Sequence, residues 1–418
     1  MRFQAPRGTN DILPADSHRW VELEGAFREL TALYGYREIR TPMFEDTELF
    51  VRSAGETSDV VSKEMYDFED KGGRKITLKP EGTAPIIRAV VEHSLCPPGT
   101  VLRLCYITPF FRYDRPQKGR YRQAHQMGLE LVGSGTPEAD AEIIEITIRF
   151  YERIGIDGAK ARINSLGREE CRKRYRDALL TFAEPHLKNE SEETRAKVAK
   201  NPLRLLDSKS PEIQEMLKGA PIVTDFLEPE SKANFERLQE LLTKAGVPYE
   251  VDPSIVRGLD YYTETVFEVL TDKLGAQSAL CGGGRYDGLV KELGGPPTPS
   301  VGVGMGVERA LLVLDEMGKT WPDPSVQVYV VRATPDAAVQ VAEIARELRT
   351  AGISCLADLD SRSLKSQLGQ ADKAGARFAL IIGSDELAKN VVQLRDLKGS
   401  AQSEEPRVGI VDALRSKL

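Results

Sequence analysis

The stretch 168–246 constrains the fold of this chain more than any other feature of its sequence. It is highly charged, five prolines interrupt it, and its apolar residues do not alternate as they do in strands, so it predicts a helical module. The segments before and after it carry the runs of apolar and β-branched residues that are typical of strands. A helical module between two such segments indicates one β-rich domain with an insertion.

A second boundary follows at 318–325, a short linker that contains two prolines. Beyond it, strand-like runs alternate with helical periods, which predicts a parallel or mixed sheet in a small α/β domain. The predicted organisation is a β-rich domain in two parts (1–167 and 249–317), the helical insertion (168–248), the linker, and the α/β domain (326–418).

Periodicity and turn residues predict the individual elements. The first helix follows a candidate N-cap at Asp16 or Ser17. The predicted helices are 16–35, 138–154, 337–351 and 363–374. The predicted strands are 36–43, 75–78, 101–111, 129–132, 249–256, 265–270, 279–282, 326–331, 353–356, 378–382 and 391–394, and 302–314 is predicted to pass from a strand into a helix.

The composition excludes several classes of protein. The five cysteines form no Cys-x-x-Cys pair and the four histidines are scattered, so the sequence predicts neither a metal site nor a disulfide framework. No apolar run is long enough for a signal peptide or a membrane span, so we expect no membrane role and a cytoplasmic location. The net charge of −7 argues against a chain coated with nucleic acid.

One segment concentrates positive charge. Between Arg103 and Arg122 there are six basic residues and one acidic residue, Asp114, although the chain as a whole is acidic. Such a cluster indicates an anion-binding site, while a solvated charged face is the simpler alternative. Pro116 and Gly119 favour a strand–loop–strand hairpin that carries the cluster.

The segment 257–263 combines an arginine, Arg257, with one carboxylate and two tyrosines, Tyr261 and Tyr262. An arginine stays charged, and its planar fork fits a carboxylate or a phosphate. A tyrosine presents a hydroxyl on a rigid apolar ring. The segment therefore predicts a pocket that holds an anion and orients a small polar substrate; the alternative is an exposed strand with scattered polar residues.

Two glycine-rich segments match no nucleotide-binding loop. Glycines at every second position over 302–306 do not have the spacing of a dinucleotide fingerprint, and the three glycines 282–284 are not followed by the lysine of a P-loop. Consecutive glycines allow a backbone to approach a ligand or another strand closely. A flexible hairpin turn explains them equally well.

Six segments, in the expected order, resemble motifs of the histidyl-tRNA synthetases, a family of class II aminoacyl-tRNA synthetases. The hairpin 111–130 is similar to class II motif 2, 302–311 is similar to motif 3, and Pro42 is similar to the motif 1 proline at the dimer interface. The histidine-specific motifs and the amino-acid loop of the family are matched by 257–263, 282–287 and 79–83.

The resemblance implies an α+β catalytic domain built on an antiparallel sheet, the class II synthetase fold, with a helical insertion and a C-terminal α/β anticodon-binding domain. It implies an enzyme that activates L-histidine with ATP to histidyl-adenylate and transfers the histidyl group to the 3′ end of tRNA(His). It also implies Mg²⁺ on the phosphates and a homodimer. Phosphoryl chemistry of this kind needs mainly charge neutralisation and positioning.

The resemblance assigns the ATP-binding and catalytic residues. The catalytic residues it implies are Arg257, which reaches the α-phosphate and the substrate carboxylate, and Arg112, which holds the α-phosphate. Arg120 is expected on the outer phosphates and Arg309 on the γ-phosphate. No side chain of the protein is assigned as a metal ligand.

The resemblance also assigns the histidine-binding residues. Glu130 and Tyr262 are expected to contact the imidazole ring, which has one nitrogen that donates and one that accepts. Glu81, Thr83 and Gln126 are expected to hold the α-amino and carboxylate groups. Tyr261 and Tyr286 are expected to line the pocket. The full histidine set is Glu81, Thr83, Gln126, Glu130, Arg257, Tyr261, Tyr262 and Tyr286.

The sequence departs from the family pattern at two positions. Asp114 stands where motif 2 commonly carries a glutamate, and Ala124 stands where the family usually places an aromatic ring against adenine. Two other classes stay open. One is a synthetase-like regulatory subunit of ATP phosphoribosyltransferase, which does not aminoacylate and typically lacks the anticodon-binding domain; the other is a class II synthetase for threonine, proline or glycine, which would lack 257–263.

Overall fold

A computed structural model describes most of the chain. The described residues are 3–55, 58, 60–185, 187, 195, 198, 202–206, 211–255, 261–273, 279–322, 325–399 and 401–418. Arg257, predicted as a catalytic residue, lies outside them. The chain divides into two compact units, Met1–Trp321 and Pro322–Leu418.

Within the described residues, eight strands form the main sheet of the first unit, in the order β1-β5-β6-β11-β10-β9-β7-β8. The strands from β5 to β7 in this order are antiparallel, and the edge pairs β1–β5 and β7–β8 are parallel. The bounds are β1 Arg37–Glu38, β5 Leu102–Phe111, β6 Gln123–Val132, β7 Lys160–Ser165, β8 Tyr249–Val251, β9 Thr263–Leu270, β10 Ala279–Arg285 and β11 Ser300–Gly306. The predicted fold class of this unit is confirmed.

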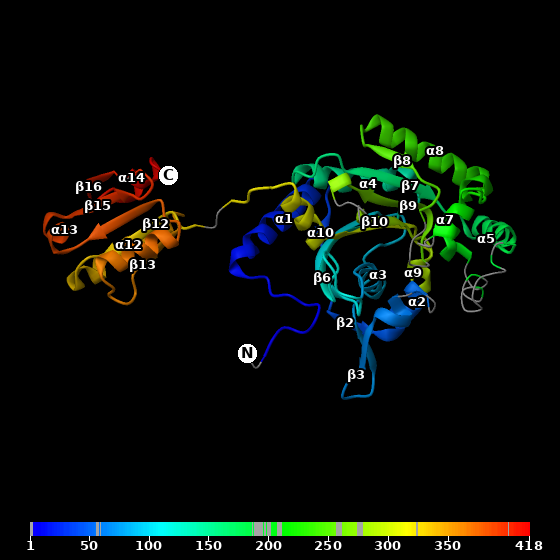
Figure 1. Cartoon of the computed structure of the whole chain (residues 1–418), viewed down its shortest axis with the longest axis horizontal. Helices are drawn as coiled ribbons and strands as arrows, with labels where there is room; N and C mark the ends of the chain where they lie inside the picture. Colours follow the sequence, from blue (N-terminus) through cyan, green and yellow to red (C-terminus); the bar gives the residue numbers. More distant parts are fainter. Residues whose placement is uncertain are drawn as a thin grey trace. The chain divides into compact units, whose positions relative to one another are not determined.

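Among the described helices, four bury their apolar sides in one core with Met127, Leu129 and Leu131 of β6. These helices lie on one side of the main sheet (Figure 1). Three of these helices, α1, α4 and α8, begin with a proline, whose fixed φ and missing N–H suit the first helical position. The bounds are α1 Pro14–Leu33, α4 Pro137–Arg153, α8 Pro229–Lys244 and α10 Val307–Glu316.

The opposite face of the sheet carries a second core, which includes Leu104, Tyr106 and Val266. Side chains alternate along a strand, so the even-numbered residues of β6 point to this face. Short helices and a small sheet of order β2-β4-β3 lie beside it. Their bounds are β2 Phe44–Asp46, α2 Thr47–Ala54, β3 Tyr66–Glu69, β4 Lys75–Leu78, α3 Thr83–Glu92 and α9 Leu289–Glu292.

The stretch predicted as a helical insertion is helical in its described parts. Its first part has an apolar cluster of its own, which includes Cys171, Tyr175 and Leu179. The last helix of the stretch, α8, instead shares the main core with α4. The elements of the first part are α5 Glu169–Ala183, the 3₁₀ turn Pro202–Leu205, α7 Pro211–Leu217 and the 3₁₀ turn Val223–Phe226.

The second unit is an α/β domain with a mixed sheet, as predicted. The strand order is β13-β12-β14-β15-β16 in the described residues; β12 runs parallel to β13 and β14, and the last two pairs are antiparallel. The strands are β12 Val328–Arg332, β13 Cys355–Ala357, β14 Phe378–Ile382, β15 Val391–Asp396 and β16 Gln402–Pro406. The helices are α11 Ala338–Thr350, α12 Leu364–Lys373, α13 Ser384–Lys389 and α14 Ile410–Arg415.

The sequence predicts some elements wrongly. The strand predicted at 36–43 is too long, because only Arg37 and Glu38 pair with β5, and Pro42 has no N–H to donate to a neighbouring strand. Helix α3 is missed because seven of its ten residues are buried, and a short apolar run does not by itself distinguish a helix from a strand. Strand β7 and the elements β16 and α14 are missed as well.

A buried ion pair joins α4 to the end of β10. Arg285 Nη2 lies 2.5 Å from Asp140 Oδ1, with the side chains 3% and 6% exposed. The same guanidinium donates to the carbonyl oxygens of Ser134 and Thr136, and Thr265 donates to Asp140 at 2.7 Å. The pair therefore fixes the end of β10, directly before Tyr286, against α4 and β9.

We expect Asp140→Ala to destabilise the protein by about 3–5 kcal/mol, because it leaves the Arg285 guanidinium buried without its carboxylate. Urea denaturation measures the loss. The control is Glu138→Ala on the same helix, since the Glu138 side chain is 53% exposed where it pairs with Arg237, and such a pair contributes less than about 1 kcal/mol. Equal losses in the two variants would contradict the importance of the buried pair.

Candidate active site

A cavity of about 410 Å³ opens on the second face of the main sheet, over β5, β6, β9, β10 and β11. Almost all predicted site residues that the structure describes line it. They are Glu81, Thr83, Arg112, Arg120, Gln126, Tyr261, Tyr262, Tyr286 and Arg309. Glu130 lies beneath its floor, bonded to two of them. Residues far apart in the sequence thus meet at one cavity, which has a carboxylate end (Glu81 and Glu130) and an arginine end (Arg112, Arg120 and Arg309).

Glu130 is the central group of the carboxylate end and has no exposed surface. One carboxyl oxygen accepts a hydrogen bond from Thr83 Oγ1 at 2.8 Å, and the other accepts one from the Tyr286 hydroxyl. Burial raises the pKa of Glu130 to about 8, and the two hydroxyl donors only partly oppose this shift. The shift favours the protonated form of Glu130.

Glu81 is held at the start of α3. Its two carboxyl oxygens accept hydrogen bonds from the backbone N–H groups of Thr83 and Ala84, at 2.6 and 2.8 Å. These are first-turn groups without partners inside the helix. Burial raises the pKa of Glu81, while these two N–H groups and nearby Arg112 lower it. Gln126 Oε1 accepts from Gly82 N at 3.1 Å and ties the same loop to β6.

Three tyrosines form the wall of the carboxylate end. The ring centroids of Tyr261 and Tyr262 are 4.7 Å apart, and those of Tyr261 and Tyr286 are 5.7 Å apart. All three side chains are at least nine-tenths buried. They give this end of the cavity rigid sides, with hydroxyl groups on apolar rings.

The glycines of β11 make room for the polar side chains of β6. An added Cβ at Gly302 would lie 1.8 Å from Glu130 Oε2, and one at Gly304 would lie 1.7 Å from Gln126 Nε2. Gly302 pairs with Glu130 and Gly304 with Gly128 in the register of the two strands. On the other side of β11, a Cβ at Gly283 would lie 2.3 Å from the carbonyl oxygen of Gly302. The glycine spacing therefore serves close approach, one of the two predicted explanations.

The arginine end brings three cations to one space. Arg112 donates from Nε to the carbonyl oxygen of Pro80 at 2.8 Å, and Arg309 donates from Nη1 to the carbonyl oxygen of Ala279. Burial lowers the pKa of Arg112, and burial together with nearby Arg120 lowers that of Arg309. Like charges that face one cavity favour an anion between them.

The two departures from the family pattern also lie at the arginine end. Asp114 Oδ2 is 2.8 Å from Arg120 Nε, so its carboxylate pairs with a predicted phosphate-binding side chain. Ala124 is the cross-strand partner of Phe110, and both line the cavity. The guanidinium of Arg112 lies 5.3 Å from the Phe110 ring centroid. Counting the hairpin register from its loop could have identified Phe110 as the neighbour of Ala124.

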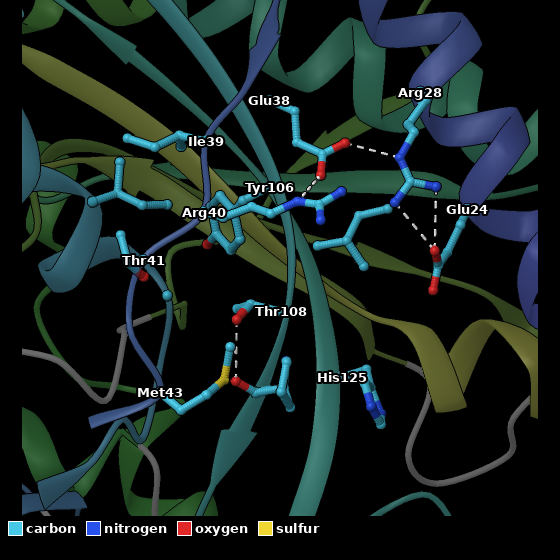
Figure 2. Close-up of a pocket in the computed structure, with 14 residues that line it drawn as sticks. Glu24, Arg28, Glu38, Ile39, Arg40, Thr41, Met43, Tyr106, Thr108 and His125 are labelled. Carbon is cyan, nitrogen blue, oxygen red and sulfur yellow. Dashed lines mark hydrogen bonds and ion pairs between the residues drawn. The ribbon is translucent and has the colours of Figure 1, made fainter. Parts of the chain in front are cut away.

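A second cavity, of about 400 Å³, lies beside the turn around Pro42 (Figure 2). Its charged side chains pair with one another: Arg28 with Glu24 and Glu38, and Arg40 with Glu38. No predicted site residue lines it. The predicted site residues therefore gather at the first cavity.

Comparison with known proteins finds matches along nearly the whole chain. The family model described as "Histidyl-tRNA synthetase" matches residues 8–310, and the model described as "Anticodon binding domain" matches 327–417. The chain is 45% identical over 405 residues to a protein named histidine–tRNA ligase from Thermoanaerobacter pseudethanolicus, and 97% of each chain is covered.

Solved structures show the same likeness. The apo histidyl-tRNA synthetase of S. aureus matches 99% of this chain and 100% of its own, with a TM-score of 0.85 and 36% identity. A Bacillus halodurans C protein described as an ATP phosphoribosyltransferase regulatory subunit/histidyl-tRNA synthetase matches with a TM-score of 0.65 and 25% identity, over 89% of this chain and 97% of its own. The fold is that of a class II aminoacyl-tRNA synthetase.

The chain belongs to the histidyl-tRNA synthetase family, as its motifs predicted. The match of 327–417 to an anticodon-binding domain also confirms the predicted nature of the second unit.

The buried carboxyl of Glu130 predicts a specific pH dependence of stability. Its pKa is about 8 in the native state against an ordinary value of 4.5. The proton on Glu130 thus contributes its full share to the free energy of unfolding below about pH 4.5. This contribution is lost as the pH rises through about 8. Glu130→Gln stays neutral, so we expect it to gain stability relative to the unmodified protein over this range, by at most about 5 kcal/mol.

Urea denaturation at a series of pH values, without substrates, measures this difference. The control is Glu22→Gln on the exposed side of α1, which should follow the unmodified protein at every pH. Parallel curves for Glu130→Gln and the unmodified protein would show that Glu130 is ionised in the empty cavity.

Proposed function

We propose that this protein is a histidine–tRNA ligase, which activates L-histidine with ATP and transfers the histidyl group to the 3′ end of tRNA(His). The observation that carries the proposal is the single cavity in which three arginines face two buried carboxyl groups and three tyrosines. Such a cavity suits one substrate with a polar ring and an amino group beside another with several phosphates. The family match and the full-length relatives support the same activity.

Histidine recognition is assigned to the carboxylate end. An imidazole needs an acceptor for its N–H and a donor for its other nitrogen. Glu130 and Tyr262 supply these groups, while Tyr261 and Tyr286 line the ring. Glu81, Thr83 and Gln126 hold the amino and carboxylate groups of the substrate. A site built from buried polar groups rejects apolar amino acids, because those groups would lose their partners.

ATP binding is assigned to the arginine end. Arg112 contacts the α-phosphate, Arg120 the outer phosphates and Arg309 the γ-phosphate. Arg257, which is outside the described residues, is assigned to the α-phosphate and the substrate carboxylate from the family resemblance. In the first step a histidine carboxylate oxygen attacks the α-phosphorus, and the bond to the leaving pyrophosphate breaks. Fixed cations stabilise the charge that develops in this step.

Mg²⁺ fits this arrangement as an ion held mainly by the phosphates. The described residues contain no cluster of three histidine, cysteine, aspartate or glutamate side chains that could hold a metal. Mg²⁺ commonly uses one or two carboxylates together with substrate phosphates and water. Glu268, which lines the arginine end, is the carboxylate that we assign to it. When bound, the ion would neutralise charge on the phosphates.

The second step needs tRNA(His). The hydroxyl of its terminal ribose attacks the carbonyl carbon of histidyl-adenylate, and AMP leaves. The unit from Pro322 onward is assigned to the anticodon, since it matches an anticodon-binding domain. The exposed basic residues Arg115 and Lys118 of the hairpin loop are assigned to the acceptor end of the tRNA.

We also propose a homodimer and a cytoplasmic location. Strand β1 is an edge of the main sheet, and beside it Met43 and Phe44 are 40% and 53% exposed. An apolar surface at a sheet edge suits a second copy of the chain. None of the described helices combines the length and apolar character that a membrane span requires.

The regulatory-subunit alternative is not favoured. A chain of that kind typically lacks an anticodon-binding domain, whereas 327–417 match one. Relatives named histidine–tRNA ligase also match over nearly the whole length of both chains.

ATP–pyrophosphate exchange with each of the twenty amino acids tests the function, and we expect exchange with histidine alone. Arg257→Ala should lower kcat by about 10² or more, because the lost contact is to charge that develops during the reaction. Arg115→Ala is the matched control, since it also removes one arginine but from outside the cavity, and it should exchange normally. Near-normal turnover of a folded Arg257→Ala protein, checked by circular dichroism, would reject the assigned role.

Phe110 is the aromatic side chain that we assign to adenine in place of the missing ring at Ala124. Stacking of a base on an aromatic ring contributes about 1–3 kcal/mol, so Phe110→Ala should raise the KM for ATP about tenfold. The double variant Phe110→Ala/Ala124→Phe should recover part of the loss, and the KM for histidine should stay the same in both. An unchanged KM for ATP in Phe110→Ala would exclude this contact.

A further inference from the structure

Helix α5 of the helical module contacts the segment that carries Tyr262 into the cavity. Arg172 donates from Nη1 to the carbonyl oxygen of Tyr262 at 2.9 Å. Arg168, the N-cap residue directly before α5, donates from Nε to Glu264 Oε1 at 3.1 Å. The two arginines therefore hold the backbone and a side chain at the start of β9.

Glu264 is held in an unusual conformation at this contact. Its φ is +47°, in the left-handed region that a residue with a side chain seldom adopts. Its backbone N–H donates to the carbonyl oxygen of Gly167, and its carbonyl oxygen accepts from Leu166 N, at 3.1 and 2.7 Å. The buried carboxylate also accepts from Ser231 Oγ at 2.7 Å. Strain of this kind persists only where several contacts enforce it.

The contacts fix the backbone directly beside a wall of the cavity. Tyr262 is 7% exposed, lines the cavity and packs against the ring of Tyr261. The carbonyl group that Arg172 holds belongs to Tyr262 itself, and Glu264 is two residues further along the chain. A shift of α5 therefore changes the direction in which the Tyr262 ring enters the cavity.

We propose that Arg172 is a positioning residue for the carboxylate end of the cavity. It acts through the backbone of Tyr262. The contact between Arg168 and Glu264 holds the same segment two residues further along the chain. The inference rests on the proposed function, in which Tyr262 contacts the imidazole of histidine. It links the affinity for the amino acid to the position of the helical module. Because such coupling is reciprocal, bound histidine restrains α5 in return.

The test compares Arg172→Ala with Arg174→Ala in histidine-dependent ATP–pyrophosphate exchange. Arg174 is on the same helix, but it donates to the carbonyl oxygen of Phe226 within the helical module. We expect Arg172→Ala to raise the KM for histidine about tenfold, as for the loss of one charged hydrogen bond, with the KM for ATP nearly unchanged. Arg174→Ala should leave both constants unchanged.

Amide hydrogen exchange gives a second readout, which general destabilisation would not reproduce. Histidine should slow exchange along α5 in the unmodified protein and in Arg174→Ala, but not in Arg172→Ala. Equal rises of both KM values, or protection of α5 by histidine in Arg172→Ala, would overturn the proposal. If Arg172→Ala does not fold, Arg172→Met decides by the same criteria, because it keeps an apolar stem and loses every N–H donor of the guanidinium.

The proposed function and this inference fail in different ways. If the unmodified protein shows no histidine-dependent exchange, the proposed function is wrong. If it exchanges with histidine and Arg172→Ala has the same KM for histidine, the function stands and the positioning role of Arg172 is wrong.

Discussion

The site depends on the burial of one carboxyl group, Glu130, in the middle of the main sheet. A carboxyl in this position is costly unless hydroxyl groups bond to it. Thr83 and Tyr286 supply these bonds from two different segments of the chain. The side chain also needs space that only a glycine at 302 leaves on the neighbouring strand. The amino-acid loop, β6, β11 and the end of β10 are therefore held in one arrangement by a single group.

The rest of the first unit keeps this arrangement rigid. The ion pair of Asp140 and Arg285 fixes the backbone directly before Tyr286. On the other side of the tyrosine wall, Arg172 holds the carbonyl oxygen of Tyr262. Helix α8 is the last helix of the stretch that the sequence predicts as an insertion, and it shares the main core with α4. This end of the stretch is therefore part of the core of the first unit. Preorganised polar groups of this kind bind a ligand without first having to be ordered.

The two ends of the cavity divide the electrostatic requirements of the reaction. At one end, two buried carboxyl groups with raised pKa values would face the polar ring and the amino group of the proposed histidine. At the other end, three arginines face one another and favour a polyphosphate between them. The proposed chemistry joins the two substrates where these ends meet, near Arg112. Little further chemistry is required of the protein, since positioning and charge neutralisation supply most of the catalysis.

The sequence by itself determined the kind of chain this is. The strand and helix periods gave the fold class, and the order of the motifs gave the family, because both depend on local spacing. Only the tertiary structure decided why positions 302 and 304 of β11 must be glycines and that α5 contacts Tyr262. These facts depend on pairing register and on contacts between distant segments, which no local pattern encodes. Helix α3 was missed for another reason: seven of its ten residues are buried, and a short apolar run can be either a helix or a strand.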